Sequence, residues 1–286
     1  MKVIRAKVLG FCMGVRRAVE MAVRECSVQE GHVYTLGPLI HNPAVLENLK
    51  KRGVKILEEG EIPPEPENAV VIIRAHGVPR KLEADLRRQG VRILDATCPH
   101  VKLSQMKARS FAEKGFRIFL AGEENHGEIS GIRGYVEQPC YVVGNPEAAE
   151  GAAAELLRRE PDAMAALIAQ TTISANEYRA IGEGLLRSFP ALEILDTICG
   201  ATAERQEALR ELCYQVDAVI VAGGRESANT RRLLSLAGES GKPAWLVQTP
   251  QEIPAQIGAY KTVGLSAGAS TPDSLIAEIE EALKAL

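Results

Sequence analysis

The chain has 286 residues, a formal net charge of −3, 46% hydrophobic residues and 4% aromatic residues. This length and hydrophobic content suffice for one large domain or for two to three small ones with their own cores. No block of Lys or Arg is present, so we expect no nucleic-acid partner. No apolar run reaches the roughly 18 residues of a membrane span and no signal-peptide pattern occurs, so we expect a cytoplasmic protein with no membrane partner.

Three stretches of the chain share one predicted element, an apolar run that leads to a cysteine and then to a helix. ILDATC ends at Cys98, ILDTIC ends at Cys199, and the looser VLGFC ends at Cys12. Apolar residues at the spacing of an amphipathic helix follow Cys12 and Cys199. Each of these cysteines is therefore predicted to lie at a strand-to-helix junction.

Downstream of each cysteine, a strand ends in Gly and is followed by a polar loop, as in YTLGPLIHNP, FLAGEENHGE and VIVAGGRESANT. Four residues past that Gly lie His41, His126 and Ser227, at intervals of 29, 28 and 28 residues from the cysteines (12 to 41, 98 to 126 and 199 to 227). Intervals this similar indicate a true internal repeat. Glu128 and Asn229 lie two residues further along the second and third loops.

Another strand and loop follow in each unit, as VVIIRAHGVP, ALIAQTTIS and VGLSAGASTP. These loops present His76, Gln170 with Thr171, and Ser270. In the first unit, residues 58–68 hold three Pro and five Glu and are predicted to form a surface loop. Because ligands bind outside the carboxyl ends of strands in open parallel sheets, we expect the polar residues to converge on one pocket.

The repeat predicts an α/β protein built from three modules related by pseudo-threefold symmetry. We place these modules at residues 1–95, 96–195 and 196–286. The strand before each cysteine could pair within its own module or with the preceding one, and the sequence leaves both pairings open.

The six cysteines of this chain are not expected to form disulfides, because cytoplasmic thiols are kept reduced. Cys26, Cys140 and Cys213 lie in apolar runs or on apolar helix faces and are interpreted as core residues. The three repeated cysteines lack the close spacing of zinc fingers and ferredoxins. Three thiolates without an obvious fourth ligand favour an iron–sulfur cluster with one iron open to a substrate oxygen.

The polar loop residues indicate what lies beside this metal. Glu128 could relay protons, whereas His32 and His100 lie off the repeated positions and are interpreted as structural. No P-loop pattern is present, but the remaining loop residues are donors suited to a phosphate or diphosphate. These donors are His41, His76, Ser227, Asn229 and Ser270.

Several segments together carry a resemblance to a known family: GFCMGVRRAV, GPLIHNPAV, IRAHGVP, DATCP, the HGE of ENHGEISG, QTTIS, DTICGAT followed by RQEAL, and SAGASTP. Nearly end to end, the chain resembles the 4-hydroxy-3-methylbut-2-enyl diphosphate reductases, the last enzymes of the non-mevalonate isoprenoid pathway. The resemblance implies a trefoil of three pseudo-symmetric αβ domains around a central 4Fe-4S cluster. Its ligands are implied to be Cys12, Cys98 and Cys199.

The resemblance also implies a reaction and roles for the loop residues. The substrate hydroxyl meets the open iron, the cluster supplies two electrons, and the oxygen leaves as water to give isopentenyl or dimethylallyl diphosphate. His126, Glu128 and Thr171 are implied to serve the hydroxyl end and the protons. A ferredoxin or flavodoxin is the expected electron donor for a cluster of low potential. The residues implied to hold the diphosphate are His41, His76, Ser227, Asn229 and Ser270.

The sequence departs from the family near the diphosphate, where the usual Asn-Ser-Ser-Asn run carries Glu226 and Ala228 instead of Asn and Ser. Glu226 places an acid beside the anion site, and Ala228 lacks a hydroxyl donor. These changes favour an alternative, a related iron–sulfur protein with a different substrate. Gly200 and Gln105, the latter where the family often has His, are further differences. A third hypothesis is a non-enzymatic iron or zinc site in a redox-sensing or binding protein.

Overall fold

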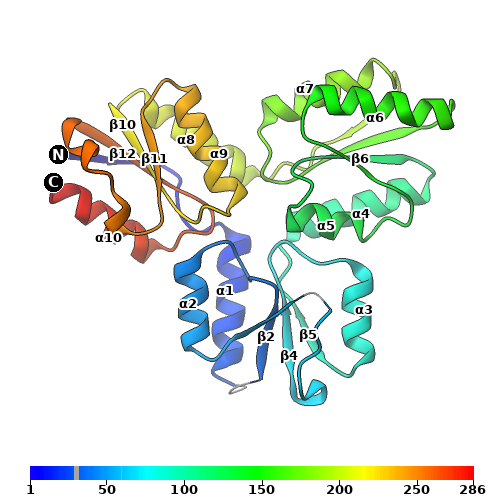
Figure 1. Ribbon diagram of the computed structural model, residues 1–286, viewed down its shortest axis with the longest axis horizontal. Helices are drawn as coiled ribbons and strands as arrows, with labels where there is room; N and C mark the ends of the chain where they lie inside the picture. The colour runs from blue at the N-terminus through cyan, green and yellow to red at the C-terminus, as the bar shows by residue number, and fades with distance from the viewer. Residues whose placement is uncertain (29–31, 59) are drawn as a thin grey trace. The chain divides into compact units, whose positions relative to one another are not determined.

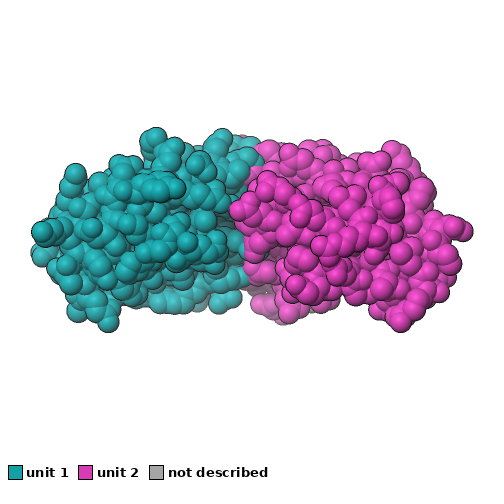
Figure 2. Space-filling view, turned by 90° about the horizontal axis from the view of Figure 1, so that it is seen from above, with its two compact units in different colours: residues 1–23, 40–52, 200–286 teal, residues 24–39, 53–199 magenta. Residues whose placement is uncertain are grey.

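A computed structural model describes residues 1–28, 32–58 and 60–286 of the chain. The residues form two compact units, teal and magenta in Figure 2. Unit 1 comprises residues 1–23, 40–52 and 200–286, and unit 2 comprises residues 24–39 and 53–199. Both units are thus assembled from segments that are distant in sequence.

Each of three sheets contains four parallel strands, one sheet in unit 1 and two in unit 2 (Figure 1). Across the sheet of unit 1 the order is β1 (Lys2–Arg5), β12 (Thr262–Ala267), β10 (Ala218–Ala222) and β11 (Ala244–Val247). The first sheet of unit 2 has the order β3 (Lys55–Leu57), β2 (Val33–Leu36), β4 (Val70–Ile73) and β5 (Arg92–Asp95). The second has the order β7 (Tyr141–Val143), β6 (Arg117–Ala121), β8 (Ala165–Ala169) and β9 (Glu193–Leu195). The prediction of an α/β fold is confirmed.

Helices and short 3-10 turns connect these strands. Unit 1 contains most of α1 (Met13–Cys26), with α2 (Pro43–Lys51), α8 (Gly200–Cys213), α9 (Ala228–Glu239), η2 (Pro250–Glu252), η3 (Ala255–Ala259) and α10 (Asp273–Lys284). Unit 2 contains η1 (Pro66–Asn68), α3 (Arg80–Arg88), α4 (Pro99–Glu113), α5 (Gly127–Arg133), α6 (Pro146–Arg159) and α7 (Ala175–Leu186). The amphipathic helices expected after Cys12 and Cys199 are α1 and α8.

Strand β10 shows how the core of unit 1 is built. Ala218, Ile220 and Ala222 pack with α10, whereas the alternate residues Val219 and Val221 pack with α8 and α9. Successive side chains of a strand point to opposite faces, so a fully apolar strand needs cover on both faces. Helices on the two faces of the sheet provide that cover.

Strand β6 shows the same alternation in unit 2. Phe119 and Ala121 pack with α6 and α7, whereas Ile118 and Leu120 pack with α4 and α5. In the first sheet of this unit, α3 packs beside β5, and Leu86 of α3 joins the core that includes Val71. The side chains of these strands are therefore committed to the cores, and polar groups collect in the loops after the strands.

Counting each repeat from its cysteine, the strand before each cysteine is the edge strand of a sheet whose other three strands come from a different repeat than the one that cysteine begins. Strand β5 pairs with β4, β9 pairs with β8, and β1 pairs with β12, which answers the question of pairing that the sequence left open. Before Cys12 the strand lies further upstream than expected, because β1 ends at Arg5 and residues 8–11 are not in a strand. Gly10 adopts a φ of 80°, which interrupts extended backbone. The three module boundaries remain a prediction.

The segment 58–68 contains the short turn η1 and exposed charged side chains, apart from residue 59, which lies outside the described residues. Among the described residues, no helix is both long and apolar enough to cross a membrane.

Candidate active site

The backbone of each repeated cysteine is held in the same way. Its N–H donates to a carbonyl two residues past the end of a neighbouring strand, β12, β4 or β8. These bonds join Cys12 to Ala269 (3.1 Å), Cys98 to Ala75 (2.9 Å) and Cys199 to Thr171 (3.0 Å).

This shared hydrogen bond sets the register of the repeat. The residue after each acceptor is Ser270, His76 or Thr172. Thr172 therefore occupies the same position in its repeat as the predicted diphosphate-binding residues Ser270 and His76 do in theirs. The sequence pattern predicts Gln170 and Thr171 at this position instead. Gln170 is buried and makes structural bonds, because its Oε1 accepts the N–H of Glu123 at 2.9 Å and its Nε2 donates to Thr172 Oγ1 at 2.8 Å.

Each of the three cysteines directly precedes the first residue of a helix, α1, α4 or α8. The positive end of a helix and its unpaired N–H groups stabilise a thiolate. Soft thiolates in equivalent turns are a donor set that suits an iron–sulfur cluster or zinc. The residues present therefore fit the cluster that the sequence predicted.

A buried carboxylate lies beside the Cys199 turn within unit 2. Glu128, 1% exposed, accepts the backbone N–H of Thr171 at 2.7 Å and its hydroxyl at 2.9 Å. Burial raises the pKa of Glu128 to about 7, although the two bonds from Thr171 oppose the rise. A carboxyl group with this pKa can hold or release a proton near neutral pH.

The two histidines of unit 2 lie next to each other. His126 is the N-cap of α5, and its Nδ1 accepts the N–H of Glu128 at 3.2 Å. This bond favours the tautomer with the proton on Nε2. The rings of His76 and His126 meet edge to face, with centroids 5.3 Å apart. The structure thus brings together four predicted residues of unit 2: His76, His126, Glu128 and Thr171.

In unit 1, the predicted donors gather at the start of α9. Ser227 is the N-cap of this helix, and its Oγ accepts the N–H of Thr230. Asn229, 4% exposed, has both atoms of its amide buried without a hydrogen-bond partner among the described residues. A buried polar group without a partner costs free energy, so this amide is suited to a polar ligand.

His41 and Ser270 complete the group in unit 1. The hydroxyl of Ser270 donates to the carbonyl of His41 at 3.2 Å. The backbone of Gly224 packs closely against the same carbonyl, where a Cβ atom would collide with it. The His41 loop, the Ser270 loop and the loop before α9 are therefore in contact within unit 1.

The two departures from the family pattern occupy different environments. Ala228 is buried in the first turn of α9, whereas Glu226 is exposed. A carboxylate in water repels a nearby anion only weakly, because solvent screens it. The exposure of Glu226 therefore gives little reason to expect another substrate.

Gln105 is completely buried in unit 2. Its amide lies against Gly77 and Gly131, where added Cβ atoms would meet it, and neither amide atom has a hydrogen-bond partner among the described residues. Gly77 follows His76, and Gly131 belongs to the helix that carries Glu128. Gln105 therefore packs beneath the predicted residues of unit 2 without being one of them.

The other cysteines and histidines show varied environments. Cys213 is buried in the core of unit 1, and Cys26 and Cys140 are half-buried. Burial raises the pKa of Cys140 to about 11, so its thiol stays protonated near neutral pH. His100 is exposed and His32 is half-buried.

Two cationic side chains that are not among the predicted site residues lie beside the cysteine turns. Arg205 is 4% exposed, and its guanidinium donates to the carbonyls of Gly10 at 2.6 Å and Ala201 at 2.7 Å. Lys102 donates to the side chain of Asp95, three residues before Cys98. The sequence offers a signal for each: a basic residue at i+4 from Cys98 indicates Lys102, and Arg205 is the first residue of the family segment RQEAL.

The fold and these groups define a class: an α/β protein whose three parallel sheets each present a thiol, with buried acid–base and amide groups in the adjacent loops. The chain belongs to the LytB protein family, whose model matches residues 3–284. The 4-hydroxy-3-methylbut-2-enyl diphosphate reductase of Treponema denticola is 44% identical over 99% of both chains. The reductase of the same name from a Thermoanaerobacter species is 36% identical over 100% of this chain and 98% of its own.

Solved structures agree with the family. The E-1-hydroxy-2-methyl-but-2-enyl-4-diphosphate reductase from Plasmodium falciparum superposes with a TM-score of 0.90 at 27% identity, covering 98% of this chain and 87% of that one. A second structure, of (E)-4-hydroxy-3-methyl-but-2-enyl diphosphate reductase, the terminal enzyme of the non-mevalonate pathway, has a TM-score of 0.72 at 35% identity over the full length of both chains.

Proposed function

We propose that the protein is the iron–sulfur reductase that converts (E)-4-hydroxy-3-methylbut-2-enyl diphosphate to isopentenyl and dimethylallyl diphosphate. The observation that carries the proposal is the full-length match to relatives of that name, at 36 to 44% identity. The allylic alcohol gains two electrons and two protons, its C–O bond breaks, and the oxygen leaves as water. The protein must therefore bind a diphosphate, deliver electrons and supply protons.

The family is one of iron–sulfur enzymes, and we assign the ligands of a single 4Fe-4S cluster to Cys12, Cys98 and Cys199. Their equivalent turns, each followed by a helix, support the assignment. When bound, such a cluster supplies the electrons, and its iron without a cysteine ligand polarises the substrate oxygen.

The proton source is assigned to the group around Glu128. Its carboxyl group, with a pKa near 7, is held in position by Thr171, whose hydroxyl can in turn reach a substrate oxygen. His126 orders the same helix turn and, through Nε2–H, offers a donor to the hydroxyl end of the substrate. A proton can then pass from Glu128 through Thr171 toward the departing oxygen.

The diphosphate is assigned to neutral and imidazole donors in the loops. Two groups at the start of α9 support this role: the amide of Asn229, which lacks a hydrogen-bond partner in the described part of the chain, and the hydroxyl of Ser227. The positive end of α9 favours an anion there. The full set is His41, His76, Ser227, Asn229 and Ser270.

We further propose a ferredoxin or flavodoxin as the electron donor, a cytoplasmic location, no nucleic-acid or membrane partner, and the module boundaries 1–95, 96–195 and 196–286. A cluster of low potential needs a donor of still lower or similar potential, which these small carriers supply.

The test is anaerobic purification followed by spectroscopy of the cluster with and without the hydroxy diphosphate. We expect a brown protein with 4Fe-4S signals that change on adding the hydroxy diphosphate, and turnover with a strong reductant. An intact cluster without turnover would refute the assigned substrate. A colourless protein that contains zinc would instead support the binding-protein hypothesis.

A further inference from the structure

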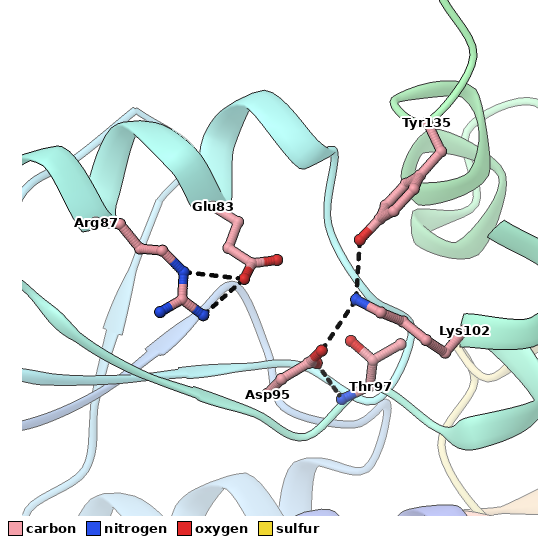
Figure 3. A network of polar contacts seen from close by, with 6 residues as sticks. All are labelled: Glu83, Arg87, Asp95, Thr97, Lys102 and Tyr135. Atoms are coloured by element: carbon pink, nitrogen blue, oxygen red, sulfur yellow. Dashed lines mark hydrogen bonds and ion pairs between the residues drawn. The ribbon is translucent and has the colours of Figure 1, made fainter. Parts of the chain in front are cut away.

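The turn before Cys98 is closed by a side chain. Asp95 is the last residue of β5, and its Oδ1 accepts the N–H of Thr97 at 2.9 Å (Figure 3). A carboxylate that bonds a backbone N–H two residues on fixes the course of a tight turn. Because Thr97 directly precedes Cys98, this bond also orients the cysteine.

Lys102 binds the same turn twice. Its backbone N–H donates to the carbonyl of Cys98 at 2.9 Å, and its Nζ donates to Asp95 Oδ2 at 3.0 Å. A lysine side chain carries a positive charge near neutral pH, so the bonds of Lys102 bring a cation to this turn.

Tyr135 connects the network to α5. Lys102 Nζ donates to the Tyr135 hydroxyl at 2.9 Å, and Figure 3 shows the ammonium between the phenol and the carboxylate of Asp95. Tyr135 lies two residues past the end of α5, the helix that begins at Gly127 beside His126 and carries Glu128. The network thus joins the Cys98 turn to the helix that carries Glu128.

The other cysteine turns are held by different groups. In the Cys199 turn, the hydroxyl of Thr197 accepts the N–H of Ala169 at 2.8 Å and donates to its carbonyl at 3.1 Å. In the Cys12 turn, Arg205 bonds to the carbonyl of Gly10. A substitution that removes the charge of Lys102 or Asp95 therefore perturbs the Cys98 turn and leaves the bonds at the Cys12 and Cys199 turns in place.

We propose that Asp95, Lys102 and Tyr135 are positioning residues that fix the Cys98 turn relative to α5. The charges of Asp95 and Lys102 also adjust the electrostatic potential at the cluster. The proposal rests on the proposed function, since it takes Cys98 to be a cluster ligand. Groups that orient metal ligands change metal affinity or activity by roughly 10- to 100-fold when removed. Side chains about one-third exposed, such as Lys102 at 37% and Asp95 at 33%, can still act on a nearby charged centre.

The experiment compares Lys102→Met, Asp95→Asn and Tyr135→Phe in the anaerobic holoprotein. We expect each variant to lose iron to a chelator about tenfold faster than the parent. The midpoint potential should become more negative in Lys102→Met, because a cation is lost, and more positive in Asp95→Asn, because an anion is lost. Tyr135→Phe removes only a hydroxyl group, so its potential should stay near that of the parent.

The matched control is Arg87→Met, which breaks the exposed pair between Arg87 and Glu83 in the same view (Figure 3). Its iron loss and potential should equal those of the parent. Potentials that shift in the same direction in Lys102→Met and Asp95→Asn, or iron loss no faster than in the control, would overturn the proposal. If Lys102→Met does not fold, the small change in Tyr135→Phe still tests iron loss. A parent protein without a 4Fe-4S signal or without turnover would instead refute the proposed function.

Discussion

Glu128 and Thr171 are 43 residues apart in the chain, yet the carboxylate of Glu128 binds both the N–H and the hydroxyl of Thr171, at 2.7 and 2.9 Å. Cys199 donates its N–H to the carbonyl of the same threonine. One residue therefore links a candidate proton donor to a candidate cluster ligand. The pair brings the acid and the thiol to the same loop.

Replacing Glu128 by Gln should abolish proton supply while keeping the shape of the side chain. We expect kcat to fall by about 100-fold or more, the usual contribution of general acid catalysis. Steady-state kinetics with a chemical reductant measures this. Glu124→Gln, an exposed acid paired with Arg133 at 3.5 Å, is the control and should keep parental kcat. Equal kcat values in both variants would remove Glu128 from the reaction.

The raised pKa of Glu128 also predicts a pH-dependent stability. Between pH 4.5 and about 7 the folded state keeps a proton on Glu128 that the unfolded chain releases, so stability falls as pH rises through this window. A shift of this size corresponds to about 3 kcal/mol. Gln at position 128 stays neutral, so the variant should gain stability relative to the parent between pH 5 and 8. Urea unfolding at pH 5 and at pH 8 measures the free energy of unfolding of variant and parent. A difference between the two proteins that is the same at both pH values would contradict a raised pKa for Glu128.

Asn229→Ala should weaken substrate binding without loss of stability. The amide has no hydrogen-bond partner among the described residues, so removing it sacrifices no bond in the free protein. We expect KM for the hydroxy diphosphate to rise by roughly 10- to 100-fold, and the unfolding midpoint to stay the same or increase.

The chain offers a matched control for this variant. Asn176 occupies the same position in the first turn of α7, after the same Ser-Ala pair, but is exposed. Asn176→Ala should leave KM unchanged. A rise in KM shared by both variants, or a clear drop in stability of Asn229→Ala alone, would mean that Asn229 has a structural role.

Gly224→Ala should separate the loop before α9 from His41. The new Cβ atom would collide with the backbone carbonyl of His41, which cannot move aside as a flexible side chain would. We expect destabilisation by about 1 to 3 kcal/mol and a higher KM. Gly238→Ala, within α9 and with open space around it, should be neutral or stabilising by up to about 1 kcal/mol. Calorimetric melting distinguishes the two variants.

Much of the local structure could be predicted from sequence. The helices after Cys12 and Cys199 follow from apolar spacing, and the strands ending near Gly37, Gly122 and Gly223 follow from short apolar runs before glycine. The prediction of a strand directly before Cys12 was wrong. Residues 8–11 form a loop around Gly10, and apolar side chains among them pack in the core from that loop. Apolar runs of this length do not distinguish a strand from a buried loop.

The sequence by itself determined the threefold repeat, the α/β class and the cysteines and polar loop residues, because periodic spacing is a local property of the chain. Only the tertiary structure decided that β1 pairs with β12, that Ser270 meets His41 across 229 residues, and that Lys102 bridges Asp95 and Tyr135. Such contacts depend on how parallel strands from distant segments align, and strand pairing leaves no periodic trace in either partner. The raised pKa of Glu128 was likewise decided only by the tertiary structure, because it comes from burial by neighbours that are remote in sequence.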